Sequence, residues 1–306
     1  MEGSSGHGRH LAERLVTAGF DAGEVPPRRT VERRRARRAP KTDHDDGYAI
    51  ARAVAGEPKL GPVKPGAGLG EAHDQLVIVR DRRDLLVQRR KTMLNHAEAA
   101  LQAAPLSWTD TGRAGRKVLP RLRAVLNAGR YPATAAEREL LELLGELHTD
   151  IAELDVRIRV LEKRLAALIA ACGSTLLDEP GIGVVTAATL LAEVGDPARF
   201  RNESAFNRWW GGAPVAISSG EGDGEPLRHR LDLLGNRTIN SVIYTISITQ
   251  SRYHQPARDY LARKRSEGHS RKEARRAHKT LLGRRIIRRM WADRRRQLDQ
   301  SHQKAA

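Results

Sequence analysis

The sequence predicts a mainly α-helical protein that begins with a partial α/β segment, continues through a coiled coil and ends in a helical domain. Three observations carry this prediction. Aromatic residues make up only 4% of the 306 residues, so the core must be aliphatic, and its Leu and Ala content is typical of helices. A long middle segment has an unbroken heptad-like spacing of apolar residues. The N-terminal region holds a single strand-like stretch.

The N-terminal segment, residues 1–55, has the pattern of a partial α/β domain. A helix-like run from His10 to Ala18 is followed by a strand-like run from Phe20 to Val25. Thr42 and Asp43 can cap a further helix, because an aspartate at a helix start accepts free backbone N–H groups and suits the positive end of the helix dipole. Since one strand is not stable by itself, we expect this segment to be a piece of a sheet domain.

Residues 56–73 are predicted to be a linker, and residues 74–172 a helical and coiled-coil region. The linker prediction rests on three prolines and five glycines between Gly56 and Gly70. A long charged helix is expected from Asp74 to Ala104, and a second helix from Arg138 to Cys172. The apolar residues of the second helix alternate at spacings of four and three, at Leu140, Leu144, Leu147, Ile151, Leu154, Ile158, Leu161, Leu165, Leu168 and Cys172.

That alternation predicts a coiled-coil seam of four and a half heptads, which requires a partner helix. Two partners are open: the Asp74–Ala104 helix folding back in the same chain, or the same helix of another subunit. The second choice would make the protein a homo-oligomer, a dimer or a tetramer. Cys172 is the single cysteine, which excludes an intramolecular disulfide and a Cys-based zinc cluster.

Residues 173–306 are predicted to form a compact helical domain that opens with a hairpin. Leu176 to Gly183 leads directly into a helix-like run from Val184 to Val194. A Pro-Gly-hydrophobic-Gly turn between helices is the core of the helix-hairpin-helix motif. Its glycines, here Gly181 and Gly183, let the backbone approach closely, and the following helix start receives a phosphate. An ordinary helix–helix turn is the alternative interpretation.

The charge is strongly basic and gathered in two segments. The chain has 54 Lys and Arg against 37 Asp and Glu, a formal charge of +17. The segment Arg28–Lys41 contributes +7 and the segment Arg271–Arg296 contributes +10, so the remainder is neutral. Clustered arginine favours a phosphate-bearing partner, DNA or RNA, over solvated helix faces. Candidate nucleic-acid-binding residues are Arg33, Arg34, Arg35, Arg37, Arg38, Gly181, Gly183, Arg228, Arg230 and Arg237.

A membrane partner is not expected. No apolar run approaches the roughly 18 to 20 residues that cross a bilayer, and no apolar face accompanies the basic segments. The start of the chain does not resemble a signal peptide. We therefore expect a soluble cytoplasmic protein, associated with the bacterial nucleoid.

Asp43 and Asp46 are the candidate metal ligands. They stand three residues apart at a helix start, so both carboxylates project from one face and can share a hard divalent cation such as Mg²⁺. Such a pair often only caps a helix. Glu2 opens a Gly-rich turn and is a third candidate ligand. Carboxylates around two Mg²⁺ ions are the arrangement that nucleases of the ribonuclease-H type use to activate a nucleophile.

Ser218 and Ser219 are the candidate nucleophiles. They lie between a turn-like Gly211–Pro214 and a Gly-rich stretch, so a hydroxyl can be presented on a loop. Many inert loops have the same composition, and a neutral serine needs activation. Arg228 and Arg230, with His229 between them, are the nearest candidates for phosphate and leaving-group contacts. Trp209 and Trp210 are interpreted as a packing anchor rather than a platform for base stacking.

Taken together, these segments resemble the IS-one-ten family of bacterial insertion-sequence transposases along nearly the whole chain. The matching motifs occur in the family's order, with the coiled coil between the two halves. They are Glu2-Gly-Ser-Ser-Gly-His-Gly, Val25-Pro-Pro, Lys41-Thr-Asp-His-Asp-Asp, Leu177-Asp-Glu-Pro-Gly-Ile-Gly, Gly195-Asp-Pro-Ala-Arg-Phe, Ala213-Pro-Val-Ala-Ile-Ser-Ser-Gly and Gly235-Asn-Arg-Thr-Ile-Asn.

The resemblance implies an N-terminal resolvase-like domain of ribonuclease-H type with a DEDD metal site, and a C-terminal domain that supplies a catalytic serine. Glu2 resembles the family's glutamate, and Asp43 and Asp46 its last two acids. Ser219, directly before Gly220, resembles the nucleophile, with Ser218 the less favoured choice. Implied partners and cofactor are DNA, a structured guide RNA, further copies of the chain, and Mg²⁺.

One departure concerns the metal site. The family's first Asp lies on a strand upstream of the glutamate, whereas this sequence begins one residue before Glu2. Two explanations are open: a start codon placed too late, or a truncated copy that is a non-catalytic DNA- or RNA-binding remnant. A purely structural coiled-coil protein is the remaining alternative.

Overall fold

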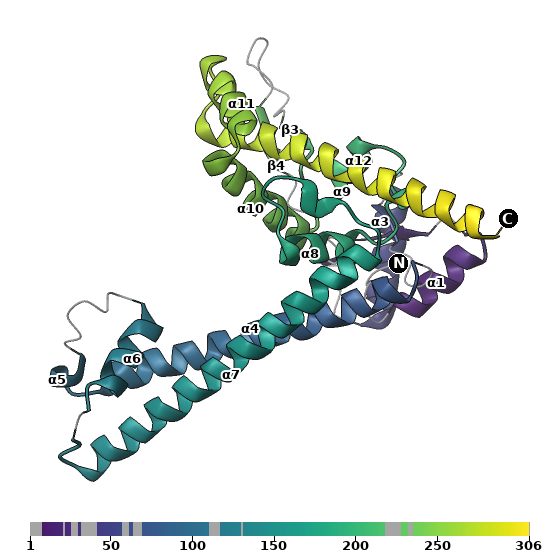
Figure 1. Ribbon diagram of the computed structural model, residues 1–306. Helices are drawn as coiled ribbons and strands as arrows, with labels where there is room; N and C mark the ends of the chain where they lie inside the picture. Colours follow the sequence, from purple (N-terminus) through teal and green to yellow (C-terminus); the bar gives the residue numbers. More distant parts are fainter. Residues whose placement is uncertain are drawn as a thin grey trace. The chain divides into compact units, whose positions relative to one another are not determined.

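The computed structural model describes residues 8–20, 22–25, 30–31, 42–56, 61–63, 69–109, 117–129, 131–217, 228–231 and 235–305. Within these ranges the protein is mainly helical, which confirms the predicted class (Figure 1). The chain divides into two compact units. One comprises Met1–Leu76 and Leu168–Ala306, and the other comprises Val77–Ala167.

The Val77–Ala167 unit is built on a long helical hairpin. Helix α4 spans Glu71–Ala103 and helix α7 spans Ala135–Ala171, close to the two long helices that the sequence predicts. Two short helices that it does not predict, α5 (Leu106–Thr109) and α6 (Val118–Asn127), lie between them in the chain. One core cluster of this unit is aliphatic apart from one tryptophan, and its buried members are Ala97, Ala100, Leu101, Ala104, Trp108, Leu122, Val125, Leu144, Leu147 and Ile151.

Helices α4 and α7 run antiparallel, because two ion pairs between them lie seven residues further along α4 and seven residues further back along α7. Arg83 pairs with Glu162 at 2.8 Å and Arg90 pairs with Asp155 at 2.6 Å. The predicted seam residues from Leu144 to Leu165 are all buried in the single chain. Helix α4 of the same chain is therefore a partner of the seam, as the first of the two alternatives predicts. Knobs-into-holes packing of a coiled coil remains a prediction.

In the other unit, the described residues of the N-terminal part include a small strand pair and the helices α1 and α3. Helix α1 spans Arg9–Thr17 and α3 spans Asp43–Gly56, so both predicted helices are found. Strand β1 (Gly23–Glu24) pairs antiparallel with β2 (Gly61–Pro62), which lies in the predicted linker. A two-residue ladder is much less than a ribonuclease-H sheet, so that fold is not confirmed by the residues described.

The C-terminal part of the same unit is a helical domain closed by one long basic helix. Its elements are the 3₁₀ turn η2 (Leu176–Asp178), α8 (Val184–Val194), η3 (Pro197–Arg199), α9 (Glu203–Trp209), β3 (Pro214–Ile217), β4 (Arg228–Leu231), α10 (Arg237–Tyr253), α11 (Gln255–Ser266) and α12 (Arg271–Ala305). Helix α12 packs against α9, α10 and α11. None of the helices described is long and apolar enough to span a bilayer.

The two adjacent tryptophans pack inside this domain, as interpreted from the sequence. Trp210 is fully buried. The ring of Trp209 lies 5.2 Å from that of Phe200 and 5.9 Å from that of Phe206, centroid to centroid. Trp209 also stacks on the guanidinium of Arg199, at 4.7 Å. An aromatic cluster of this kind anchors α9 and its following turn.

Candidate nucleic-acid interface

The glycine hairpin at Pro180–Gly183 has the local geometry that its sequence predicts. Gly181 has φ +83°, a left-handed conformation that favours glycine, and an added Cβ would lie 3.2 Å from the Cγ of Gln250. Gly183 is exposed at the start of α8, and its backbone N–H donates to the hydroxyl of Thr186 at 2.8 Å. A 3₁₀ turn rather than an α-helix precedes the hairpin, so a complete helix-hairpin-helix motif is not confirmed.

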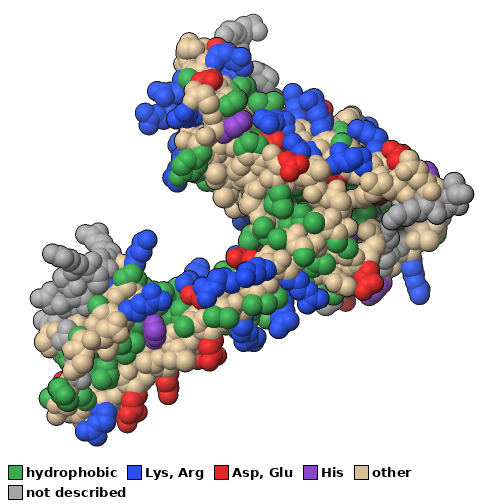
Figure 2. Space-filling model, in the orientation of Figure 1, with side chains coloured by type: hydrophobic (Ala, Val, Ile, Leu, Met, Phe, Trp, Pro, Cys, Tyr) green, Lys and Arg blue, Asp and Glu red, His purple; other side chains and the backbone are tan. Residues whose placement is uncertain are grey.

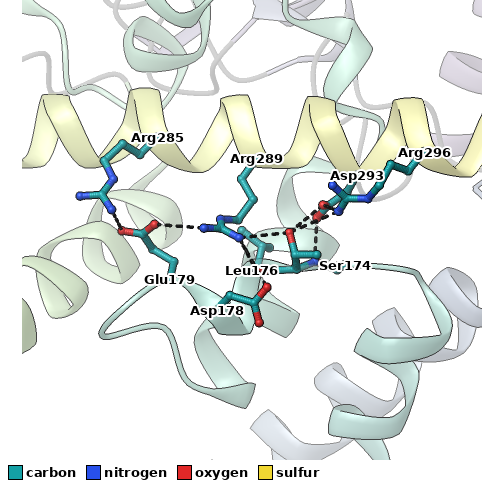
Figure 3. Close-up of polar contacts among 9 residues, drawn as sticks. Ser174, Leu176, Asp178, Glu179, Arg285, Arg289, Asp293 and Arg296 are labelled. Carbon is teal, nitrogen blue, oxygen red and sulfur yellow. Dashed lines mark hydrogen bonds and ion pairs between the residues drawn. The ribbon is translucent and has the colours of Figure 1, made fainter.

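A buried carboxylate fixes the hairpin to two helices of the domain, and Figure 3 shows its contacts with α12. Glu179 is only 4% exposed, and it pairs with Arg285 of α12 at 2.8 Å and with Arg289 at 3.7 Å. The amide of Gln250, on α10, donates to the carbonyl of Pro180 at 2.6 Å and to Glu179 at 3.3 Å. The hairpin is therefore held by side chains that are distant in the sequence, and its backbone is fixed in position.

A second buried carboxylate ties the segment before the hairpin to the same helix. Asp293 is 4% exposed and accepts hydrogen bonds from the backbone N–H and the hydroxyl of Thr175, at 2.8 and 2.7 Å. Arg289 donates to the carbonyl of Thr175 at 3.1 Å, and Arg296 pairs with Asp293 (Figure 3). Helix α12 thus contacts both ends of η2.

The basic excess of α12 divides into two groups with different surroundings. Its C-terminal arginines are paired with acidic residues of the same unit: Arg284 and Arg288 with Glu203, Arg285 and Arg289 with Glu179, Arg294 with Asp196, and Arg296 with Asp293. In contrast, Arg271, Lys272, Arg275 and Lys279 form no ion pair with the acidic residues that the structure describes. The residues available to neutralise phosphates therefore include the exposed Arg271, Lys272 and Arg295 and the half-buried Arg275, whereas Lys279 is only 7% exposed and donates to Asn240.

The candidate nucleophiles belong to a segment carried by a two-stranded hairpin. Strand β3 pairs antiparallel with β4, with Ile217 opposite Arg228 and Val215 opposite Arg230. Ser218 and Ser219 lie outside the described residues, in the segment 218–227 that joins these strands. The register places Arg228 at the last described pair before that segment.

The base of the β3–β4 hairpin is clamped where the chain enters and leaves it. On leaving, the backbone N–H of Asn236 donates to the carbonyl of Trp209 at 2.9 Å. The two ends approach so closely that glycine is required at both. An added Cβ at Gly235 would lie 2.2 Å from the backbone N of Gly211, and an added Cβ at Gly212 would lie 2.0 Å from the ring of Trp210. The two ends of the hairpin are therefore held side by side.

Two polar side chains complete this clamp, and sequence reasoning did not single them out. Asn240 donates its amide to the carbonyl of Trp210 at 3.3 Å, and Thr280 of α12 donates its hydroxyl to the carbonyl of Gly212 at 2.9 Å. The Gly235-Asn-Arg-Thr-Ile-Asn motif could have indicated Asn240, because Asn236 and Asn240 are one helical turn apart and so share one face of the helix. Arg237, a predicted phosphate contact in the same motif, is exposed at the first position of α10.

The candidate metal ligands are only partly within the described residues. Asp43 is exposed and Asp46 half-buried, three positions apart in the first turn of α3. Asp45, between them, takes part in the cap, with its backbone N–H donating to the hydroxyl of Thr42 at 3.1 Å. No group of three His, Cys, Asp or Glu side chains suited to a metal occurs among the described residues, and Glu2 lies outside them. The observed donors are two hard carboxylates, a set compatible with Mg²⁺.

The arginine run of the N-terminal segment also lies outside the described residues, namely Arg33, Arg34, Arg35, Arg37 and Arg38. Its role as a phosphate contact therefore remains a prediction.

Two buried cationic groups complete the electrostatics of the domain. Burial lowers the pKa of Arg199 to about 10, against the opposing effect of Glu24, Glu193 and Asp196, so the guanidinium stays charged at neutral pH. Burial also lowers the pKa of Lys279, and the neighbouring charge of Arg276 adds to this. The ammonium of Lys279 donates to the side-chain oxygen of Asn240 at 2.6 Å, next to the clamp.

Comparison with known proteins assigns this domain. Residues 173–262, which contain the hairpin, the clamp and α10, match the transposase IS116/IS110/IS902 family. In this domain the chain is similar to IS110-family transposases. This confirms the resemblance drawn from the sequence motifs.

Three curated transposases show how far the similarity extends. A family 20 transposase of Pseudomonas aeruginosa is 31% identical over 182 residues, which is 59% of this chain and 51% of that protein. A transposase of Sinorhizobium fredii is 28% identical over 177 residues, 57% and 42% of the two chains. The transposase for insertion sequence element IS1111A of Coxiella burnetii is 27% identical over 183 residues, 59% and 47%. The chain spans about half the length of these relatives.

Proposed function

We propose that this chain cleaves and rejoins DNA as a transposase, with Ser219 as the nucleophile and Ser218 as the less favoured alternative. The observation that carries the proposal is the clamped β3–β4 hairpin, which holds the ends of the serine-bearing segment against α9, α10 and α12. A loop on a rigid scaffold is where a nucleophile is commonly placed, and this one lies in the transposase-matched domain.

The proposed chemistry is transesterification at a DNA phosphate. The hydroxyl oxygen of Ser219 attacks phosphorus, a Ser–O–P bond forms, and the phosphorus–oxygen bond to one deoxyribose breaks. The serine hydroxyl loses its proton and the departing oxygen takes one up, so that no net proton is gained or lost and the strand is left as a phosphoserine ester. Attack by the hydroxyl of another strand reverses these steps, releases the serine and completes strand exchange. Arg228 and Arg230 would neutralise the phosphate charge.

Asp43 and Asp46, together with Glu2, would hold Mg²⁺. The ion would polarise a phosphoryl oxygen and stabilise charge in the transition state. The two aspartates would orient it from one face of the first turn of α3, where the free N–H groups of the helix favour nearby negative charge.

DNA and a structured guide RNA are the proposed macromolecular partners. Their phosphates would meet the backbone N–H groups in the first turn of α8, directly after Gly181 and Gly183, the exposed Arg237, and the N-terminal arginine run. The fixed position of the glycine hairpin, held through Glu179 and Gln250, supports a binding role because a rigid donor group loses little entropy on binding.

A homo-oligomer, dimer or tetramer, is also part of the proposal. The seam of α7 is already covered by α4, so subunit contact would use another face of the helical hairpin. Leu85 of α4 and Val156 and Val160 of α7 are more than half exposed and are suited to such a contact.

The second candidate function is nucleic-acid binding without catalysis. Its support is that the contacts which hold the glycine hairpin, through Glu179 and Gln250, involve neither Ser219 nor the candidate metal ligands. Such a protein would bind DNA with strong salt dependence and never form a covalent bond to it.

The test is a covalent protein–DNA adduct, formed with Mg²⁺, cellular RNA and labelled DNA that spans the borders of the element encoding the chain. The wild-type chain and the Ser218→Ala variant should give a denaturation-resistant adduct, and Ser219→Ala should give none. Asp43→Asn should reduce its formation. An undiminished adduct with Ser219→Ala would refute the assignment, and binding with no adduct from any form would favour the second candidate.

A further inference from the structure

We propose that Tyr244, Arg275 and Lys279 form a stacking site for an unpaired base of a DNA strand, beside the base of the β3–β4 hairpin. The proposal deepens the proposed function, on which it rests, by naming where the strand held for Ser219 would bind. These residues lie on neighbouring helices, since α10 and α12 pack against each other.

Tyr244 is an exposed aromatic ring flanked by two cations. It is 45% exposed, whereas the large aromatic side chains that build the core nearby are buried. The guanidinium carbon of Arg275 lies 5.7 Å from the centroid of the Tyr244 ring, and the ammonium of Lys279 lies 5.8 Å from it. Cations at this distance from an aromatic ring attract it, so the ring is held in place while nearly half of it stays open.

The charge around this ring is positive and suits a phosphodiester strand. Helix α10 contains no acidic residue, and α12 contains only Glu273 before Asp293. Glu273 accepts hydrogen bonds from the backbone N–H and hydroxyl of Ser270, at 2.8 and 2.7 Å. Figure 2 shows Lys and Arg side chains over the α11 and α12 face of this unit, with fewer Asp and Glu side chains among them.

The stacking site is joined to the hairpin clamp by direct contacts. Lys279 donates to Asn240, which in turn donates to the carbonyl of Trp210. The ammonium of Lys279 also lies 5.5 Å from the ring of Trp210. The next residue, Thr280, holds the carbonyl of Gly212. A strand bound at Tyr244 would therefore lie next to the two chain segments that carry the serine loop.

An unpaired DNA base is the occupant that this chemistry favours. An exposed aromatic ring beside an arginine is the arrangement in which proteins stack bases and neutralise the adjoining phosphates. Arg275 would supply this charge, whereas the buried Lys279 holds the ring in position. Bases within a duplex already stack on each other and cannot present a face to Tyr244. An acidic protein partner would satisfy the cations but would leave the ring without a flat partner.

The test is equilibrium binding of a fluorescein-labelled oligothymidylate strand and of a labelled duplex to the full chain. Tyr244→Ala should weaken single-strand binding about tenfold, which is the range of base–aromatic stacking, and Tyr244→Phe should retain it. Duplex binding should change little. Tyr253→Ala is the matched control, because Tyr253 is on the same helix and 80% exposed, and no cation that the structure describes lies over its ring.

The contribution of Arg275 is tested by the salt dependence of single-strand binding. Arg275→Ala should lower the slope of log affinity against log salt by about 0.7, the value for one phosphate on a single strand. Arg288→Ala should leave the slope unchanged, since Arg288 is exposed but paired with Glu203. Equal effects of the two variants, or of Tyr244→Ala and Tyr253→Ala, would overturn the proposal.

Two further arms separate this proposal from others. A larger loss for oligouridylate than for oligothymidylate with Tyr244→Ala would assign the site to RNA and overturn the commitment to DNA. If no adduct forms but single-strand binding still depends on Tyr244, the proposed chemistry alone is overturned. If an adduct forms that depends on Ser219 but single-strand binding does not depend on Tyr244, the stacking site alone is overturned.

Discussion

The carboxylate of Glu179 lies 2.8 Å from the guanidinium of Arg285, although 106 residues separate them and Glu179 is 4% exposed. This pair positions the glycine hairpin on α12. It also turns an arginine that the charge pattern alone would assign to phosphate binding into a structural residue.

Removal of that buried carboxylate should destabilise the domain. Glu179→Ala leaves Arg285 without its acidic partner, whereas Gln250 keeps its hydrogen bond to the carbonyl of Pro180. Because Arg285 is partly solvated, we expect a loss of about 2 kcal/mol in the free energy of unfolding. Urea unfolding measures this. Asp178→Ala is the control, since Asp178 is 70% exposed and 3.6 Å from Arg289, and it should cost less than about 0.5 kcal/mol. Equal losses would contradict the anchoring role of Glu179.

Stability should fall between pH 6.5 and pH 4 because of His278. This side chain is 2% exposed, and its Nδ1 is 2.9 Å from the hydroxyl of Ser247. Burial, with the charges of Arg285, His254 and Arg275, lowers its pKa from 6.5 to about 4. The unfolded chain therefore binds the proton more readily, and the stability present above pH 6.5 is lost as the pH falls.

The size of that effect is about 2 kcal/mol between pH 6.5 and 4.5. It is measured by urea unfolding at several pH values. His278→Gln should remove most of this dependence, whereas His269→Gln, at an exposed position, should leave it intact. The same slope in wild type and His278→Gln would show that another group is responsible.

Two glycines within helices should respond to alanine in opposite directions. At Gly283 of α12 an added Cβ would lie 2.2 Å from the side-chain oxygen of Asn207 and 2.9 Å from Nε1 of Trp210, so Gly283→Ala should cost about 1–3 kcal/mol. At Gly145 of α7 nothing lies within 4 Å, and Gly145→Ala should stabilise by about 0.5–1 kcal/mol. Thermal unfolding of both variants tests the packing of α12 on α9, and a tolerated Gly283→Ala would contradict it.

The antiparallel register of α4 and α7 predicts a specific coupling. Arg90 holds Asp155 through two contacts, of 2.6 and 3.3 Å, and both side chains are about two-thirds buried. A double-mutant cycle with Arg90→Ala and Asp155→Ala should give a coupling energy of about 0.5–1 kcal/mol. The same cycle with the exposed neighbour Arg89 should give a value near zero. A larger coupling for Arg89 would mean a different register.

The sequence alone predicts the helices because each buries a face at helical spacing. The run from Val184 to Val194 coincides with α8, and the run from Arg138 to Cys172 differs from α7 by three residues at one end and one at the other. Short elements escape this reasoning. The four-residue strands β3 and β4 carry too few side chains to display a period, so their segment is interpreted only as turn and loop.

Contacts between distant residues are the other part that sequence reasoning could not supply. Positive charge on α12 predicts a phosphate partner, but only the fold brings Glu179, Asp196 and Glu203 to its C-terminal arginines. The clamp made by Asn240 and Thr280 likewise joins residues that are distant in the sequence. Glu2 and Ser219 lie outside the described residues, so their roles remain predictions from the family motifs.

The covalent link between Ser219 and DNA is tested most directly by locating the DNA attachment point. Trypsin should release Trp209 to Arg228 as one peptide that contains both Ser218 and Ser219. After nuclease digestion of the adduct, fragmentation by mass spectrometry should place the residual nucleotide on Ser219. A nucleotide on any other residue, or DNA that is cleaved and rejoined with none attached to this peptide, would contradict the account.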